Sequence, residues 1–412
     1  MNEISCCRDD FPILRRKVYG KSLVYLDNAA TTQVPLQVTD ALCHHYSREH
    51  ANVHRGIHYL SERSTQAMEE ARERIARFLG AGAPEEIIFT HGATDGINLV
   101  ADGFAPMINA GDEVIVSVLE HHSNFVPWQQ LCLRKNAKFR VIPARDGEFD
   151  IAAYQEMLGK KTKLVAVTQV SNLTGTVMPL EEITRAAHEN GAAVLVDGAQ
   201  GTRHGQTNVR AMDCDFYCFS GHKMLATTGI GAFYGKREWL ERLAPARFGG
   251  GMVDKVTEAA TTFAPIPARL EAGTPDFAGA VALGAAIRYL EEIGVVAIAE
   301  QEEKLLCYAE TKLKYIKGLH ILGKPRKRIG AISFWMEGIH SYDLASILDK
   351  LGIAVRSGSH CAQPALHSFG ISEAVRVSPA FYNTMEEIDL LCAGIEKSAA
   401  LLWKWKNAND NL

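Results

Sequence analysis

The chain has 412 residues, of which 47% are hydrophobic and 22% charged, and these values are typical of a globular protein with two domains. Its formal net charge of -4 implies no basic surface, so we expect no nucleic acid partner. No apolar stretch is long enough to span a bilayer, and the N-terminus lacks the pattern of a secretory signal, so we expect no association with a membrane.

The nine cysteines are odd in number and follow neither a paired Cys-x-x-Cys spacing nor a Cys/His zinc pattern. We therefore expect no metal site. An unpatterned set of thiols is typical of a reducing compartment, which favours a cytoplasmic location.

Short apolar segments alternate with amphipathic helix patterns through the middle of the chain. The predicted strands are residues 86–90, 114–117, 164–168, 193–196, 216–219 and 230–234. The clearest helix runs from Pro179 to Asn190, with proline at the favoured first position and Gly191 as the terminator. This alternation predicts an α/β fold in which helices cover a mostly parallel sheet.

The composition changes between residues 249 and 275, where three glycines at 249–251 are followed by prolines at 265, 267 and 275. A long helix pattern then runs from about Phe277 to Glu292, and a strand is expected at 331–334. We predict a large domain over residues 24–263 and a smaller α+β domain over residues 264–412 together with 1–23.

Two short segments place chemical groups at the ends of predicted strands. Asp197 ends one buried strand, and Lys223 follows Ser220-Gly221-His222 after another. Ligands of open parallel sheets bind outside the carboxyl ends of the strands, so both side chains point to one crevice. A lysine there can bind pyridoxal phosphate (PLP) covalently, and an acid can keep its pyridine nitrogen protonated. The residues alone leave open that Lys223 is a surface lysine and Asp197 a helix cap or turn former.

A third segment, Gly92 to Gly96, follows a predicted strand and opens a helix pattern. A loop of small residues at a helix N-terminus can bind phosphate through its backbone N–H groups. The alternative is a plain strand-to-helix turn, and the residues alone do not decide between the two. The segment is not a P-loop, because no Gly-Lys-Ser/Thr follows at the required spacing.

Four longer runs resemble one family of PLP enzymes. Residues 213–223 (DCDFYCFSGHK) resemble the lysine segment of class V aminotransferase-like enzymes of fold-type I. Residues 51–58 (ANVHRGIH), 120–128 (EHHSNFVPW) and 356–362 (RSGSHCA) narrow the resemblance to SUF-type (group II) cysteine desulfurases and the related selenocysteine lyases. The resemblance extends from about residue 11 to residue 399 and implies a fold-type I homodimer.

The resemblance implies roles for the matching residues. It implies that Lys223 binds the cofactor covalently and that Asp197 pairs with its pyridine nitrogen. It also implies that Gln200 is hydrogen-bonded to the phenolic oxygen and that the imidazole of His121 stacks on the ring. It implies phosphate ligands at Thr94, Ser220 and His222, with Thr274 reaching the phosphate of the other subunit. It implies that the substrate carboxylate is held by Asn172 and Arg376. It also implies a sulfur acceptor, Cys361, with Arg356 in the same loop. Arg356 and His360 near this thiol are expected to favour the thiolate.

The implied reaction converts L-cysteine to L-alanine and leaves a persulfide on Cys361. The sulfur would pass to an acceptor protein of the SUF system for iron–sulfur cluster assembly. The alternatives are a selenocysteine lyase or a cysteine sulfinate desulfinase on the same scaffold, a class V transaminase, and an inactive scaffold of a sulfur-transfer complex. The chain departs from the family after Lys223, where Met224 to Gly229 replace a Tyr-Gly-Pro-Thr-Gly turn, and at Asp95, where glutamate is common.

Overall fold

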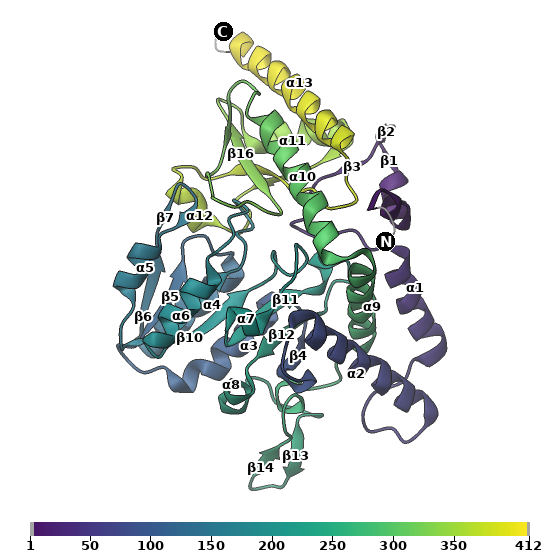
Figure 1. Cartoon of the computed structure of the whole chain (residues 1–412), viewed down its shortest axis with the longest axis vertical. Helices are drawn as coiled ribbons and strands as arrows, with labels where there is room; N and C mark the ends of the chain where they lie inside the picture. The colour runs from purple at the N-terminus through teal and green to yellow at the C-terminus, as the bar shows by residue number, and fades with distance from the viewer. Residues whose placement is uncertain (1–3, 410–412) are drawn as a thin grey trace.

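A seven-stranded sheet forms the centre of the larger part of the molecule in this computed structural model, which describes residues 4–409 (Figure 1). Its strand order is β4-β12-β11-β10-β9-β5-β6. The strands are β4 (Ile87–Thr90), β5 (Glu113–Ser117), β6 (Lys138–Ile142), β9 (Thr162–Thr168), β10 (Ala193–Asp197), β11 (Phe216–Ser220) and β12 (Gly231–Gly235). Strand β12 is antiparallel to both of its neighbours, and the other pairs are parallel. The predicted α/β class is therefore confirmed.

Six of these strands lie within a few residues of their predicted positions, because they are buried on both faces and read as apolar runs. Strand β6 was not predicted. It lies at the edge of the sheet, where Lys138 is exposed and Arg140 half-buried, so its sequence contains no apolar run.

Helices cover both faces of this sheet (Figure 1). They include α3 (Ala93–Phe104), α4 (Val126–Lys135), α5 (Ile151–Met157), α6 (Leu180–Glu189), α7 (Val209–Met212) and α8 (Arg237–Arg242). Helix α6 matches the predicted helix, except that Pro179 and Asn190 lie just outside it as the N-cap and the C-cap. A hairpin of β13 (Val253–Val256) and β14 (Thr261–Phe263) projects from the lower end of the molecule in Figure 1.

Helix α9 (Phe277–Ile293) packs against α1 (Leu36–His44) and α2 (Tyr59–Leu79). The approach of α9 to α2 is close, because a Cβ atom added to Gly284 would lie 2.9 Å from the Cβ of Ala71. The division at residues 263/264 assigns α9 to the smaller domain, and that division stays a prediction.

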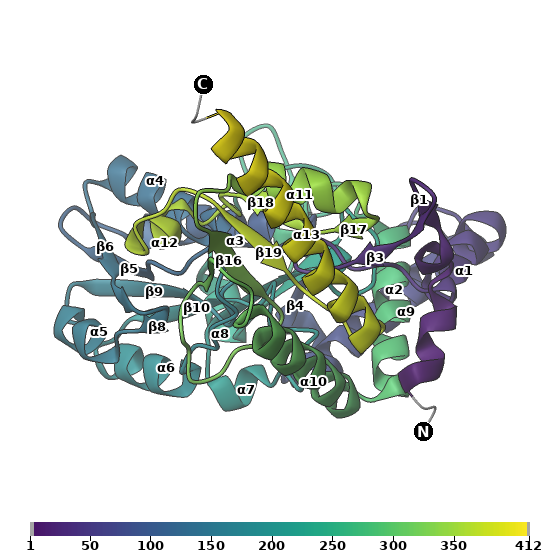
Figure 2. The same ribbon diagram turned by 90° about the horizontal axis from the view of Figure 1, so that it is seen from above.

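The smaller sheet is antiparallel and has the order β15-β16-β19-β18. Its strands are β15 (Leu319–Ile321), β16 (Ile332–Met336), β18 (Arg356–Gly358) and β19 (Ala374–Val377). The helices of this part are α10 (Val295–Leu313), α11 (Ser341–Lys350), α12 (Gln363–Ser368) and α13 (Met385–Asn409). Figure 2 shows α13 lying across this sheet, and α13 also contacts α10 and α11.

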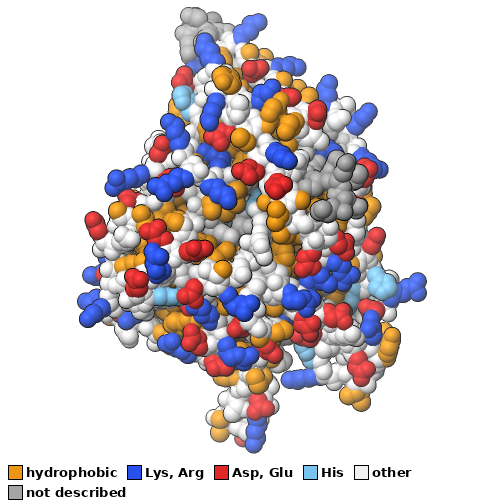
Figure 3. Space-filling model, in the orientation of Figure 1, with side chains coloured by type: hydrophobic (Ala, Val, Ile, Leu, Met, Phe, Trp, Pro, Cys, Tyr) orange, Lys and Arg blue, Asp and Glu red, His pale blue; other side chains and the backbone are white. Residues whose placement is uncertain are grey.

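Short paired segments complete the fold. They are β1 (Lys17–Val18) with β2 (Lys21–Ser22), β7 (Ala144–Arg145) with β8 (Glu148–Phe149), and β3 (Val24–Tyr25) with β17 (Ile353–Ala354). The pair β3–β17 brings the N-terminal segment beside the smaller sheet. No helix within residues 4–409 is long and apolar enough to cross a membrane. On the face shown in Figure 3, acidic and basic side chains are interspersed.

Candidate active site

A cavity of about 470 Å³ lies at the carboxyl ends of β9, β10 and β11, beneath the loop between β18 and α12. Eleven of the twelve predicted site residues line it: Thr94, His121, Asn172, Asp197, Gln200, Ser220, His222, Lys223, Arg356, Cys361 and Arg376. Because the carboxyl ends of parallel strands open at one edge of a sheet, residues far apart in sequence meet there.

Lys223 belongs to a short turn directly after β11, and its amine faces the cavity. Burial lowers the pKa of Lys223 from its ordinary value, Arg376 acts in the same direction, and the negative charge of Asp197 opposes both. A lowered pKa increases the fraction of uncharged amine, which is the form that attacks a carbonyl group.

Asp197 is the last residue of β10 and is 3% exposed. Its Oδ1 accepts a hydrogen bond from the Ala199 backbone N–H at 2.9 Å. Burial raises the pKa of Asp197, while the Ala199 N–H and Lys223 favour the charged form. The residue after Asp197 must be glycine, because a Cβ atom on Gly198 would lie 2.0 Å from the Tyr217 ring. This turn places the carboxyl group of Asp197 in the lining of the cavity.

Hydroxyl and backbone N–H groups gather where α3 begins. Ser220 Oγ accepts a hydrogen bond from the Ala93 N–H at 2.8 Å, and Thr94 lies in the first turn of α3. Gly92 has φ +141, and a Cβ atom there would lie 3.1 Å from Ser220 Oγ. Free N–H groups at the start of a helix and neighbouring hydroxyls are the groups that bind phosphate.

His121 follows β5 and lines the same cavity. Its Nδ1 accepts the Ser123 backbone N–H at 3.1 Å and lies 3.0 Å from Ser123 Oγ. The proton of the neutral ring is therefore on Nε2. Burial, together with the charge of Lys223, lowers the pKa of His121 to about 3, so the ring is neutral at physiological pH.

Ser123 is a site residue that the sequence analysis did not single out. Its Oγ lies 2.6 Å from Thr94 Oγ1 and 3.0 Å from His121 Nδ1, so it connects the end of the cavity at the start of α3 with the imidazole. A lone serine in a short loop carries no signal in the sequence. Only its contacts with Thr94 and His121 in the folded chain identify it as a site residue.

The loop between β18 and α12 carries Cys361, whose side chain is exposed at the cavity. His360 and Cys361 both have left-handed backbone conformations, with φ of 52° and 53°. The expectation that His360 favours a thiolate is wrong, because burial lowers the pKa of His360 to about 3 and leaves it uncharged. Its Nε2 lies 2.9 Å from the Ala374 carbonyl oxygen, which is a structural contact.

Two arginines share one carboxylate at the cavity. Arg356 Nη2 lies 2.9 Å from Asp27 Oδ2, and Arg376 Nη2 lies 3.3 Å from Asp27 Oδ1. Arg376 is 2% exposed. Among the described residues, Arg376 Nε and Asn172 Oδ1 are buried without a hydrogen-bond partner. A buried cation beside unpaired polar atoms can accept a carboxylate ligand. The sequence analysis did not find Asp27.

Glu120 is a third residue that the sequence analysis did not single out, after Ser123 and Asp27. It is fully buried beside His121 and accepts hydrogen bonds from Ser117 Oγ and from Asn124 Nδ2, the latter at 2.7 Å. Asn124 Oδ1 in turn accepts the Trp128 Nε1–H at 2.9 Å. Burial raises the pKa of Glu120 to about 8. The side chain is therefore mostly protonated at neutral pH.

Thr274 does not line the cavity of its own chain. It is exposed, and it borders a separate small hollow with His91 and Arg247. Arg247 forms an ion pair with Asp95, the residue that stands where the family commonly has glutamate. The implied role of Thr274 in the cavity of a second subunit stays a prediction.

The segment after Lys223 is held by packing in place of the missing proline. Met224, Leu225 and Ala226 are buried, and Leu225 has a left-handed φ of 65°. The Leu225 N–H donates to Thr32 Oγ1 at 2.9 Å. This contact ties the turn to the N-terminal segment.

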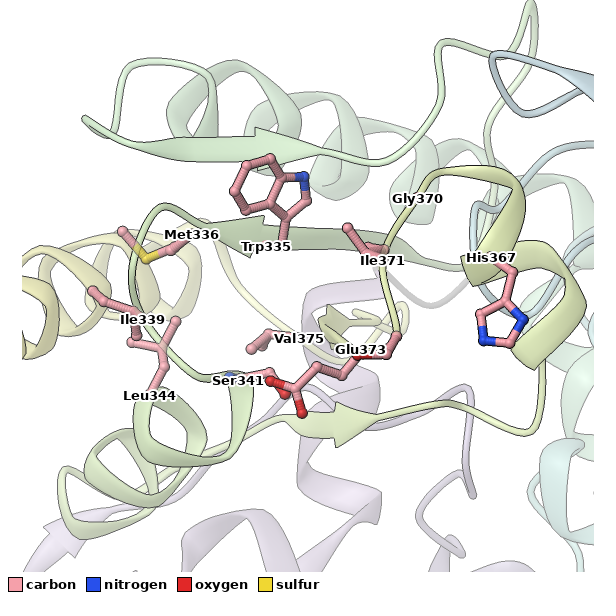
Figure 4. A pocket seen from close by; sticks show the side chains of 11 residues that line it. Trp335, Met336, Ile339, Ser341, Leu344, His367, Gly370, Ile371, Glu373 and Val375 are labelled. Atoms are coloured by element: carbon pink, nitrogen blue, oxygen red, sulfur yellow. Dashed lines mark hydrogen bonds between the residues drawn. The ribbon is translucent and has the colours of Figure 1, made fainter.

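A second hollow of about 560 Å³ lies on the smaller sheet (Figure 4). Trp335 and Met336 of β16, Leu344 of α11 and His367 of α12 line it, with Glu373 at one side. Its described lining contains no lysine, arginine or cysteine. We therefore place the chemistry in the first cavity. Within residues 4–409, no group of three or more His, Cys, Asp or Glu side chains could hold a metal ion.

The family model for class-V aminotransferases matches residues 24–391. The chain belongs to the class-V aminotransferase family. It is 47% identical over 397 residues to a cysteine desulfurase of Synechococcus elongatus, which covers 96% of this chain and 63% of that protein, so the chain spans less than two thirds of that relative. It is 45% identical over 405 residues to a probable cysteine desulfurase of Vibrio cholerae, covering 98% of this chain and all of that one.

Two solved structures of cysteine desulfurases share the fold closely. The apo cysteine desulfurase of Thermococcus onnurineus superposes with a TM-score of 0.92 at 37% identity, covering 96% of this chain and 98% of that one. The S-sulfonic acid form of the Escherichia coli cysteine desulfurase CsdA gives 0.90 at 36% identity, covering 97% and 99%. The predicted family and the fold-type I architecture are confirmed. The SUF-type subgroup stays a prediction.

Proposed function

We propose that this protein is a PLP-dependent cysteine desulfurase that converts L-cysteine to L-alanine and leaves the sulfur as a persulfide on Cys361. One observation carries the proposal: a single cavity holds the amine of Lys223, the buried carboxyl of Asp197 and the exposed thiol of Cys361. The names of the relatives that match nearly the whole chain support it.

The donor groups of the cavity fit PLP, which carries an aldehyde, a pyridine nitrogen and a phosphate. Lys223 would bind the aldehyde, and Asp197, whose buried carboxyl group lines the cavity, would pair with the pyridine nitrogen. Ser220, Thr94 and the N–H groups of α3 would hold the phosphate. When bound, the cofactor supplies a ring that accepts the electron pair left at the substrate Cα.

The roles of the remaining cavity residues follow from their chemistry. His121, neutral and without a charge to desolvate, would stack on the cofactor ring, and Gln200 would donate to the phenolic oxygen. His222 would add a phosphate contact. Each of these three is a proposal that the lining of the cavity supports.

The substrate carboxylate would bind to Arg376 and Asn172. Arg376 has an unpaired Nε, and Asn172 Nδ2 carries a second N–H besides the one that it donates to the His360 carbonyl oxygen. Asp27 forms an ion pair with each of the two arginines, so binding of the substrate carboxylate would rearrange these ion pairs. Arg356 would orient the substrate from the Cys361 loop.

Lys223 would remove the proton from the substrate Cα, because its amine is uncharged more readily than an ordinary lysine. The Cys361 thiolate would then attack the substrate sulfur. The bond between that sulfur and Cβ breaks as the sulfur–sulfur bond to Cys361 forms, and a proton completes the methyl group of alanine. The thiol and cysteine together thus yield alanine and a persulfide, with no external oxidant.

We further propose that the protein is a cytoplasmic homodimer that passes sulfur to an acceptor protein of the SUF system for iron–sulfur cluster assembly. The exposure of Thr274 and of the hairpin β13–β14 supports a second subunit at that end of the molecule. The exposure of Cys361 supports transfer to another protein.

The test compares wild type with Cys361→Ala on two substrates. Wild type should release alanine from cysteine and gain the mass of one sulfur atom on the peptide that contains Cys361. The variant should lose nearly all alanine release from cysteine, roughly 10²-fold or more, since the attacking thiolate is gone. It should keep much of the release from selenocysteine, because a selenol is more acidic and leaves more readily.

The exposed Cys307 provides a matched control, and Cys307→Ala should behave as wild type. Unchanged alanine release from cysteine in Cys361→Ala would refute the proposed mechanism. An equal loss on both substrates with an intact visible spectrum would show that Cys361 does more than accept sulfur. A selenocysteine lyase would act on selenocysteine and leave cysteine almost untouched.

A further inference from the structure

Two hydrogen bonds join the loop of Cys361 to the segment that carries His121. The backbone N–H of His122 donates to the Cys361 carbonyl oxygen at 2.8 Å. The backbone N–H of Gln363 donates to His122 Nε2 at 3.3 Å. His122 follows β5 of the large sheet, whereas Cys361 lies between β18 and α12 of the smaller part. His122 thus holds the chain on the C-terminal side of the cysteine and links the two parts of the molecule.

The Cys361 turn needs such contacts because its conformation is costly. His360 and Cys361 are two consecutive non-glycine residues with left-handed φ, a conformation that L-residues rarely adopt. The exposed side chain of Cys361 contributes no packing. On the N-terminal side, Asn172 Nδ2 donates to the His360 carbonyl oxygen at 2.8 Å. The contacts of His122 are the corresponding restraint on Cys361 and the residues after it.

The imidazole of His122 accepts a hydrogen bond from a backbone N–H group that has no acceptor within α12. Gln363 is the first residue of α12, and N–H groups in a first helical turn have no acceptor within the helix. His122 Nε2 can accept only when the ring is neutral and its proton is on Nδ1. Burial lowers the pKa of His122, which favours this neutral form.

We propose that His122 is a positioning residue for sulfur transfer, which holds the Cys361 turn over the cavity and fixes it relative to His121. This inference rests on the proposed function. His122 does not line the cavity, so it acts through the backbone of Cys361 and Gln363. The neighbouring His121 faces the cavity, and the two residues together join the thiol loop to the wall on which the cofactor ring would stack.

The test uses the holoenzyme and the substitutions His122→Phe and His122→Gln. Phenylalanine keeps a flat ring but cannot accept a hydrogen bond, whereas the Oε1 of glutamine can reach the position of Nε2. We expect His122→Phe to lower kcat for alanine release from cysteine by roughly 10- to 100-fold, as misplacement of a reacting group does. KM for cysteine and alanine release from selenocysteine should stay near wild type. His122→Gln should restore most of the lost kcat.

A second measurement does not depend on turnover. Amide hydrogen exchange of the peptide around residues 359–364 should be faster in His122→Phe than in wild type, and slow again in His122→Gln. The control is His320→Phe, the same substitution at an exposed histidine on β15 that stacks on Trp335. It should change neither kcat nor exchange at the Cys361 loop.

Several outcomes would overturn the inference. Exchange of the loop that is the same in wild type and His122→Phe would show that the imidazole contact with Gln363 does not hold the turn, which would overturn the role of this side chain. Faster exchange with an unchanged kcat would show that the reaction does not need the turn held. An equal fall of kcat on both substrates would place the effect in the Lys223 chemistry or in the fold. Failure of wild type to release alanine from cysteine would instead refute the proposed function, and the exchange data would still decide the structural claim.

Discussion

At the scale of single residues, Lys223 is the only lysine among the described residues that line the cavity. Lys223→Ala should therefore lower turnover by roughly 10²- to 10⁴-fold or more, since in the proposed mechanism Lys223 is both the covalent anchor and the base. PLP should still bind without a covalent bond, through Asp197 and the phosphate-binding end. Borohydride reduction followed by peptide mapping should label Lys223 in wild type. Lys163→Ala, at the opposite end of β9, serves as the control, and a label on any lysine other than Lys223 would refute the assignment.

Glu120 gives a prediction for stability against pH. Its folded pKa of about 8 lies above the ordinary value of 4.5, so the folded state binds more protons than the unfolded state between these values. Wild-type stability should therefore fall as the pH rises from about 5 to 8, by up to a few kcal/mol from this residue. Glu120→Gln cannot titrate, so its free energy of unfolding relative to wild type should rise over the same window. Denaturant unfolding at pH 5, 6.5 and 8 measures this difference.

The comparison is internally controlled, because all other titrating groups are common to both proteins. A difference between wild type and Glu120→Gln that does not change with pH would mean that Glu120 is ionised in the folded state. The hydrogen bonds from Ser117 and Asn124 would then stabilise the charge against burial.

At the scale of elements, the contact of α9 with α2 depends on the absence of a side chain at Gly284. Gly284→Val should lower the free energy of unfolding by roughly 1–3 kcal/mol, because the new Cβ alone would lie 2.9 Å from the Cβ of Ala71. Denaturant unfolding measures the change. Arg288→Val, an exposed β-branched substitution one turn further along α9, separates overpacking from helix propensity and should cost about 0.5 kcal/mol. Equal effects of the two substitutions would contradict the packing argument.

The elements also show which secondary structure the sequence could predict. Strands β9, β10 and β11 are buried on both faces and therefore appear as apolar runs. The edge strand β6 has charged residues at alternate positions and gives no such signal. The first residue of a helix depends on its cap, which a sequence pattern does not locate to a single residue. Pro179 was therefore predicted as the first residue of α6, whereas it is the N-cap just before it.

At the scale of the whole molecule, the position of Thr274 gives a test of the dimer. Lys223→Ala chains are combined with Thr274→Val chains, and heterodimers are purified with two tags. If Thr274 serves the partner's cavity, one site carries both defects and the other is intact. The heterodimer should then have about half of the wild-type activity. Each homodimer provides its own control, and an active site as weak as that of the Thr274→Val homodimer would show that Thr274 acts within its own chain.

The sequence by itself determined the family, the main strands and eleven residues that meet in one cavity, because strand ends and local motifs are properties of short segments. Only the tertiary structure decided the rest. Asp27 lies between Arg356 and Arg376, and His122 contacts the backbone of Cys361, although these partners are more than 200 residues apart in sequence. No local sequence pattern predicts these contacts, because they depend on how the smaller sheet packs against the edge of the larger one. The uncharged state of His360 likewise follows from burial in the folded chain, which the sequence around Cys361 does not express.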